Sequence, residues 1–215
     1  MHTLIERLDR WYHTFRPAHL KGLNPGADDA ALQRLRDRAS APLPPLLEEL
    51  LSWHDGTAHD CYEGFQFNRH LMSCDDIVTV MDELEELRAA GEFEEPFWWN
   101  EQWLPFLDNG GGDFICVDLG GCFDGVPGQI VEFWHDDADR AIAYPSFEAW
   151  LETFVVALER GMFAEENGGL HPNDDGDFDA FVAARHPGYP IPMTATGECE
   201  EEDDEDWGED DEDDE

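Results

Sequence analysis

The sequence predicts an α+β fold in which a sheet is flanked by helices, with an additional N-terminal helix and a disordered acidic C-terminal tail. Three observations lead to this prediction. Apolar residues recur at helical spacing through much of the first ninety residues. Strand-like apolar runs then surround a glycine-rich turn in residues 103–119, and two more such runs follow. An amphipathic helix pattern after residue 145 can close the sheet.

The first helix is predicted over residues 3–15. Thr3 and Glu6 have the spacing of a capping box, in which two side chains accept hydrogen bonds from orphan backbone N–H groups. Pro17 ends the helix, because proline cannot continue one. Its apolar face consists of Leu4, Ile5, Leu8, Trp11, Tyr12 and Phe15.

A second helix is predicted from Asp28 and Asp29 to about Ser40. Its Arg34 and Arg38 share one face, where they are either solvated or in contact with a partner. A third helix is expected to begin at the prolines that follow Leu43, since proline is tolerated in a first turn. Its apolar stripe is Leu46, Leu47, Leu50 and Leu51, and Gly56 takes the position after its cap.

Short strands and one long helix are predicted next. Residues 62–67 alternate like a strand, and residues 70–72 can form another. Ser73 begins a helix, because its hydroxyl can cap the first turn and the acids after it favour the positive end of the helix dipole. Gly91 ends this helix. Residues 92–102 mix acids with aromatic residues and show no regular pattern.

Residues 103–119 are the centre of the predicted sheet and have the pattern of strand, turn and strand. Pro105 indicates that the first strand is irregular or at an edge. Residues 108–112 form the turn, because glycine adopts positive φ without steric cost and Asp and Asn bond their own backbone. The three glycines lack the strand-to-helix context of a dinucleotide site. The second strand, residues 114–117, is apolar on both faces and is therefore expected to be buried.

After a loop rich in glycine and proline, residues 129–134 and 140–144 are predicted strands. Ser146 then caps the clearest amphipathic helix of the chain, which is expected to close the sheet. Beyond Gly161, residues 167–169 and 173–176 are predicted loops. One short helix is expected around Phe178, Phe181 and Val182. The tail from Met193 onward is expected to be disordered, because it cannot bury enough apolar area.

The charge of the chain is strongly negative. There are 52 acidic and 12 basic residues among 215, a net charge of −40. Residues 198–215 contribute 15 of the acids, so the remainder still carries about −25. Such a field repels nucleic acid and anionic membranes, and it accelerates encounter with a cationic partner. A need for solubility, or a salt-loving host, accounts for the charge equally well.

The sequence indicates a cytoplasmic protein. No window approaches the roughly 18 apolar residues of a membrane span. Residues 1–15 have charges inside their apolar pattern and do not resemble a secretory signal. The five cysteines form no regular disulfide framework, so reduced thiols are expected.

No catalytic motif is evident, and we expect a protein that is not an enzyme and has no cofactor and no metal. A P-loop is excluded because Lys21 is the only lysine. His54, His59 and Cys61, or Cys116 with Cys122, could hold zinc, but neither set has the paired spacing of a structural site. The loop after His171 resembles a calcium loop but lacks the final Glu. If this protein were an enzyme, its activity would need a metal.

Four stretches in order resemble the SUKH superfamily, in particular its Smi/Knr-type domain, named for cell-wall assembly regulators. They are Leu43-Pro44 entering a helix that ends at His54-Asp55-Gly56; Trp103-Leu104-Pro105-Phe106 before the glycine-rich turn; Asp113-Phe114-Ile115-Cys116-Val117-Asp118; and Gly128-Gln129-Ile130-Val131 with Ser146-Phe147-Glu148-Ala149-Trp150-Leu151. The resemblance implies a mixed, mostly antiparallel sheet flanked by helices. It suggests an N-terminal helical extension (1–24), a SUKH domain (25–160), a C-terminal extension (161–192) and the tail (193–215).

Bacterial members of this superfamily resemble immunity proteins, which bind a secreted toxin in the cell that makes it. The resemblance therefore implies a non-enzymatic protein that neutralises a cognate, basic, nucleic-acid-acting toxin by occluding its active site. The alternative is a regulatory scaffold that binds partners through its acidic tail, and the oligomeric state is open. The Trp98-Trp99 pair can be an interface hot spot or core packing. The candidate partner-binding residues are Glu94, Glu95, Trp98, Trp99, Asp108, Asp113 and Asp124.

Overall fold

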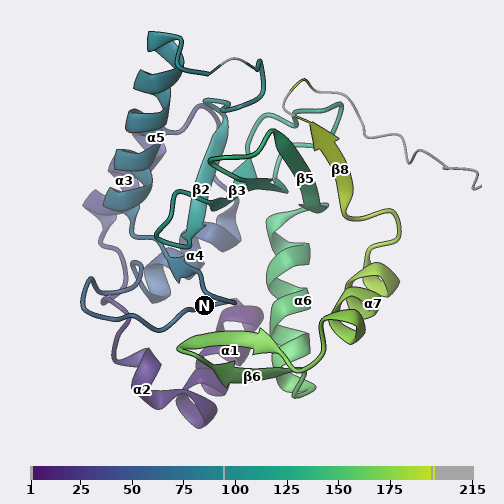
Figure 1. Ribbon diagram of the computed structural model, residues 1–215. Coiled ribbons are helices and arrows are strands. Elements are labelled where there is room, and N and C mark those ends of the chain that lie inside the picture. Colours follow the sequence, from purple (N-terminus) through teal and green to yellow (C-terminus); the bar gives the residue numbers. More distant parts are fainter. Residues whose placement is uncertain (1, 94, 195, 197–215) are drawn as a thin grey trace, which may run out of the picture.

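The computed structural model of the chain describes residues 2–93, 95–194 and 196 (Figure 1). The helices of this part are α1 (Thr3–Phe15), α2 (Pro17–Leu20), α3 (Asp29–Arg38), α4 (Pro45–Trp53), α5 (Cys74–Ala90), α6 (Phe147–Glu159) and α7 (Asp175–Arg185). Its strands are β1 (His70–Leu71), β2 (Trp103–Asp108), β3 (Phe114–Asp118), β4 (Gln129–Phe133), β5 (Asp139–Tyr144), β6 (Phe163–Glu166), β7 (Gly169–Pro172) and β8 (Ile191–Thr194). Most of the predicted acidic tail lies outside the described residues.

A six-stranded sheet with the order β1-β2-β3-β4-β5-β8 forms the centre of the protein. Each neighbouring pair in it is antiparallel. The predicted α+β class is confirmed, with helices packed around an antiparallel sheet (Figure 1). β2 and β3 are both interior strands of the sheet, as the apolar character of residues 103–119 predicts.

The hairpin of β2 and β3 has the predicted turn. Gly110 and Gly112 adopt φ values of 75° and 98°, which only glycine reaches without strain. The Gly110 N–H donates to Asp108 Oδ1 at 2.6 Å, and the Gly111 N–H donates to Asn109 Oδ1 at 2.8 Å. The register of β2 against β3 shifts after Pro105, so the expected irregularity is confirmed.

The two faces of the sheet are covered by different segments. Trp150 of α6 packs against Phe106 of β2 on one face, with ring centroids 4.7 Å apart. Glu132 of β4 lies on the same face, since it lines one cavity with Trp150. Successive residues of a strand point to opposite faces, so Phe133 lies on the other face. There Trp99 packs on Phe133 with a centroid distance of 5.6 Å. The irregular segment before β2 therefore covers the face that α6 leaves open.

Several helix ends agree with the prediction, and two do not. Ser73 and Asp76 form a capping box at the start of α5, and Ser146 caps α6. At α1, however, His2 is the N-cap and accepts a hydrogen bond from the Leu4 N–H, so the capping box of Thr3 and Glu6 is wrong. Thr3 is already helical and cannot act as the cap.

Gly56 does not directly follow the cap of α4, since that cap is His54. Its role is a close approach of two backbone segments. It adopts a φ of 80°, and a Cβ at this position would lie 2.4 Å from the Ser73 backbone nitrogen. Glycine is needed here because the chain before α5 passes directly over it.

The strand predicted over residues 62–67 is wrong. This segment forms only isolated β-bridges, between Gln66 and Arg69 and between Phe67 and Leu170. Phe67 has a φ of 54°, which interrupts the extended conformation that a strand requires. The alternating pattern reflects instead a loop that buries Phe65 and Gln66.

The chain beyond α6 contains more regular structure than predicted. The loop predicted over residues 167–169 is the turn and start of a hairpin of β6 and β7, in which Asn167 and Gly168 adopt φ values of 51° and 81°. β8 then extends the main sheet beside β5. Met193 and Thr194, placed at the start of the tail by the sequence, belong to this strand. The short helix predicted around Phe178 is confirmed as α7.

Arg34 and Arg38 of α3 are neither simply solvated nor free for a partner. Arg34 pairs with Asp75 at 2.7 Å, and Arg38 pairs with Asp82 at 2.5 Å. Both acids belong to α5, so these ion pairs lie between the two helices. Their exposed geometry makes each worth only about 0–1 kcal/mol.

The N-terminal helix packs into the same core as the sheet. Trp11 Nε1 donates to the Leu158 carbonyl at the end of α6, and the Tyr12 hydroxyl donates to the Phe65 carbonyl. The chain then buries Arg16 and His19, which are 4% and 1% exposed. None of the helices in the described part of the chain has the length and apolar character that crossing a membrane requires.

His19 predicts a pH dependence of stability. Burial, assisted by the nearby Arg16 charge, lowers the pKa of His19 to about 3. Neither ring nitrogen makes a hydrogen bond to another described residue, and the Glu63 carboxylate, 3.5 Å from Nδ1, is partly exposed and also faces Arg16. Below about pH 6.5 the unfolded chain binds a proton at this histidine that the folded chain does not bind. The His19 contribution to stability is therefore lost progressively as pH falls.

Between pH 7 and pH 5 we expect this single group to lower the free energy of unfolding by about 2 kcal/mol. Urea unfolding at both pH values should show that the drop is about 2 kcal/mol smaller in His19→Leu, which cannot titrate. Equal drops in the two proteins would mean that His19 is protonated in the folded state.

Candidate functional site

The segment before β2 carries four of the seven predicted partner-binding residues. Glu94 lies outside the described residues. Glu95 is half-buried, and its carbonyl accepts a hydrogen bond from the Trp98 N–H at 3.2 Å. Trp98 is also half-buried, since the Phe93 ring stacks on it and the Arg140 guanidinium lies 5.4 Å from its ring centroid. Part of Trp98 therefore remains accessible.

Trp99 has the other role that the sequence left open. It is only 1% exposed and packs against Trp103 and Phe133. It is therefore a core residue, and its side chain is not presented to a partner in this structure. Sequence reasoning could not separate the two tryptophans, because the segment has no period that assigns one of them to the inside.

Arg140 of β5 holds this segment on the sheet. Its Nη2 donates to the Trp98 carbonyl at 2.9 Å, and its Nη1 donates to the Asp137 and Asp139 carbonyls at 2.7 and 2.6 Å. The side chain is 1% exposed, and burial lowers the pKa of Arg140 to about 10. It remains charged at neutral pH, so the bonds to the three carbonyls are charge-assisted.

The predicted loop acids are not gathered in one place. Asp108 and Asp113 flank the β2–β3 turn, whereas Asp124 lies in the loop at the opposite end of β3. Asp113 already accepts hydrogen bonds from Asn109 Nδ2 and from the backbone N–H of His135. Although burial acts against it, bonding with His135 and Asn109 lowers the pKa of Asp113. Asp124 is exposed.

Asp118 is the acid whose role the sequence missed. It is fully buried at the end of β3 and accepts hydrogen bonds from the N–H groups of Gly120, Gly121 and Cys122 and from Gln129 Nε2. These bonds hold the loop that presents Asp124. An acid at the end of an apolar strand, two residues before a Gly-Gly pair, was the available signal.

The cysteines and histidines considered for zinc are not assembled into a site. Among the described residues, the one group of three metal-type ligands is Asp113, His135 and Asp136, whose ligand atoms lie within 4.8 Å of one another. His135 Nδ1 is 2.8 Å from Asp113, and this contact raises the pKa of the exposed His135. Burial raises the pKa of Cys116 and raises the pKa of Cys122 to about 12, so both thiols are protonated and poor ligands or nucleophiles.

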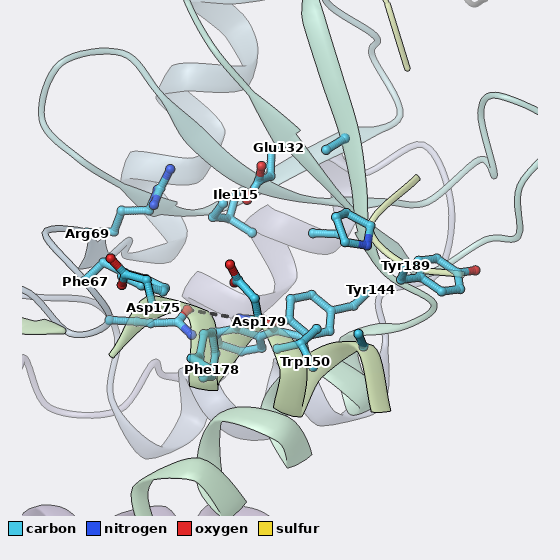
Figure 2. A pocket seen from close by; sticks show the side chains of 16 residues that line it. Phe67, Arg69, Ile115, Glu132, Tyr144, Trp150, Asp175, Phe178, Asp179 and Tyr189 are labelled. Atoms are coloured by element: carbon cyan, nitrogen blue, oxygen red, sulfur yellow. Dashed lines mark hydrogen bonds between the residues drawn. The ribbon is translucent and has the colours of Figure 1, made fainter. Parts of the chain in front are cut away.

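A cavity of about 570 Å³ opens between the sheet and α7 (Figure 2). Ile115 of β3 and Glu132 of β4 line it from the sheet, and Phe178 and Asp179 line it from α7. Trp150 of α6 contributes an aromatic wall. Most of the lining is apolar or aromatic, with a few charged groups, as in pockets that hold ligands.

The charged groups of the cavity come from three separate parts of the chain. Arg69 precedes β1, Glu132 belongs to β4, and Asp175 and Asp179 belong to α7. Burial raises the pKa of Glu132, while the Arg69 charge opposes this. No local pattern connects these residues, so the sequence alone could not have predicted the cavity.

The class of protein that this fold defines is an α+β domain built on an antiparallel sheet. The chain belongs to the SMI1 / KNR4 family (SUKH-1), whose family model matches residues 26–153, more than half of its length. Members of this family are generally non-enzymatic immunity or regulatory proteins. No curated protein matches the chain. The predicted resemblance is thus confirmed, while α1, α7 and β6 to β8 lie outside the matched region.

Proposed function

We propose that this protein is an immunity protein that binds a cognate, basic, nucleic-acid-acting toxin in the cytoplasm of the producing cell and occludes its active site. One observation carries the proposal: a chain with a SUKH-1 domain whose residues 1–197, without the acidic tail, still carry a net charge of about −25. A toxin that acts on nucleic acid has a site for phosphate, which is a basic surface. An acidic domain is steered to that surface and can occupy it.

The partner-binding surface that we propose includes Glu95, with the preceding Glu94, and the accessible part of Trp98. Phe97 of the same segment packs against Phe123 with ring centroids 4.8 Å apart. This contact brings the segment beside the loop that carries Asp124. Acids around an aromatic residue suit a basic interface, because the ring supplies contact area and cation–π attraction.

The test is a pull-down of the tagged full chain from its native host, at low and high salt, followed by mass spectrometry. Recovery of one basic, toxin-like protein that is lost at high salt supports the proposal. Salt shortens the Debye length and so screens the attraction between exposed charges. Recovery of many unrelated proteins would contradict it.

Charge reversal of Glu94 and Glu95 to Lys should weaken binding of the toxin by about tenfold or more and reduce the salt dependence of its association rate. The matched control is the double variant Asp60→Lys and Glu166→Lys. Both control acids are exposed, and neither makes an ion pair with another described residue. The measurement is surface plasmon resonance from about 50 to 300 mM salt, a range over which added salt shortens the reach of interactions between exposed charges. Equal losses in both double variants would show that total charge matters and this surface does not.

The alternative is a regulatory scaffold that binds several partners through the acidic tail. Deleting residues 197–215 separates the two functions and leaves β8 intact, since that strand ends at Thr194. An immunity protein should retain its toxin after this deletion. Loss of every partner would favour the scaffold.

A further inference from the structure

Carboxylates project into the cavity between the sheet and α7 from two opposite walls. In Figure 2, Glu132 projects from the sheet and Asp179 projects from α7 toward the same space, with Tyr144 and Trp150 beside them. The Glu132 and Asp179 charges both contribute, after burial, to raising the pKa of the Tyr144 phenol. Two acids on opposite walls therefore act on one region of the cavity.

Among the described residues, the carboxylates of Glu132, Asp175 and Asp179 make neither a hydrogen bond nor an ion pair. Arg69 is the cation on this wall, but its guanidinium lies 5.3 Å from the Trp134 ring centroid and forms no ion pair with Glu132. Three carboxylates thus face one guanidinium, and the cavity has an excess of acceptors for a cation.

The wall of the cavity also carries hydrogen-bond donors. Gln66 is 4% exposed and lines the cavity, and its Oε1 accepts a hydrogen bond from Trp150 Nε1 at 3.0 Å. Its amide nitrogen donates to no other group in the described part of the chain. Arg69 Nε is buried and has no hydrogen-bond partner among these residues. A buried donor without a partner is costly, so a bound molecule with an acceptor oxygen would satisfy it.

We propose that this cavity binds an arginine side chain of the protein partner, with the guanidinium between Glu132 and Asp179 and the adjoining backbone carbonyl near Gln66 and Arg69. The proposal rests on the proposed function for the identity of the partner. Arginine fits better than lysine because its planar guanidinium can bond carboxylates on two sides and stack on Tyr144 and Trp150. The cavity volume of about 570 Å³ leaves room for the aliphatic part of the side chain against Phe178 and Ile115.

The position of the cavity relative to the family domain supports a role in partner choice. Its sheet wall belongs to the region that the SUKH-1 model matches, whereas Asp175, Phe178 and Asp179 belong to α7, outside that region. The carboxylate pair therefore exists only because a segment beyond the family domain packs against it. A protein can refine its specificity for one toxin in this way without changing the domain itself.

The first experiment titrates the full chain, labelled with ¹⁵N, with N-acetyl-L-arginine amide and follows amide shifts by NMR. We expect saturable shifts at α7, β4 and β5 with a Kd on the order of 1 mM. N-acetyl-L-lysine amide should bind at least threefold more weakly, and N-acetyl-L-norleucine amide should produce no saturable shift. Absence of shifts at the cavity, or equal binding of all three probes, would overturn the proposal. Tighter binding of free L-arginine than of the amide would indicate that the cavity holds a small molecule and not a side chain of a partner. This result would also overturn the proposal.

The second experiment compares Glu132→Gln combined with Asp179→Asn against Asp177→Asn as control. Asp177 lies on α7 two residues from Asp179, is exposed, and does not line the cavity. The double variant should lose at least fivefold in affinity for the arginine probe, and the control should not change. Thermal unfolding of both proteins establishes that they are folded.

The two proposals fail separately. The NMR titration uses no toxin, so its result stands even if no toxin is recovered from the host. If the toxin is recovered and binds the double variant as tightly as the unchanged protein, the cavity proposal is overturned and the immunity function remains.

Discussion

Replacing Asp118 by alanine is expected to lower the free energy of unfolding by about 4 kcal/mol, because it leaves one buried and three partly buried donors without their acceptor. Asp118 Oδ1 accepts from the Gly120 and Gly121 N–H groups, both at 3.0 Å. Asp118 Oδ2 accepts from the Cys122 N–H at 2.6 Å and from Gln129 Nε2 at 2.8 Å. Urea unfolding followed by circular dichroism measures the change.

Two further variants isolate the role of the carboxylate. Asp118→Asn keeps one acceptor oxygen but turns an amide NH₂ toward two donors, so a loss of about 2 kcal/mol is expected. Asp124→Asn changes the same charge in the same loop, at an exposed position where Asn tolerates the φ of 55°. It should change stability by less than about 0.5 kcal/mol. If Asp118→Ala cost less than about 1 kcal/mol, the loop would have to be held by other contacts.

The elements that the sequence predicts correctly are those whose signals are local. Ser146 and the apolar spacing after it determine α6, and the Asp-Asn-Gly turn determines the β2–β3 hairpin. In both cases the residues that cap or turn the chain lie within a few positions of the residues that they affect. Hydrophobic period and backbone preference are then sufficient.

The missed elements show where local reasoning is insufficient. Asn167-Gly168 is a strong hairpin signal, but only Phe163, Leu170 and Gly169 are buried around it, so the flanking residues lack strand alternation. β8 contains Pro192, which lowers strand propensity. It is stable as a strand because it pairs with β5 at the edge of the sheet, where a missing N–H is tolerated.

The candidate site was predictable only in its composition. The sequence shows that acids surround tryptophans before β2, yet the structure decides that Trp99 is buried and Trp98 stays partly accessible. The cavity was not predictable, because Glu132 and Asp179 meet only after α7 packs against the sheet. Their separation in sequence leaves no pattern to recognise.

Replacing Arg140 by alanine is expected to cost about 4 kcal/mol of stability and also to release the segment that carries Glu95 and Trp98. Within the described residues, Arg140 forms no ion pair with a carboxylate. The backbone carbonyls that it bonds, together with the Phe133 ring 4.8 Å from its guanidinium carbon, replace a counter-ion. Alanine removes the donor to these carbonyls and leaves a cavity beneath Trp98.

The effect on the segment distinguishes Arg140 from an ordinary core residue. Hydrogen exchange of the amides of Glu95, Phe97, Trp98 and Trp99 should accelerate in Arg140→Ala more than exchange in α6, because the bond to the Trp98 carbonyl is lost. Arg140→Lys keeps the charge but cannot reach the three carbonyls with the same planar geometry, so about half of the stability loss is expected. Uniform acceleration throughout the protein would indicate general destabilisation. If the acceleration is local and toxin affinity falls with it, the order of this segment contributes to binding, because a partner must then bear the entropy cost of ordering it.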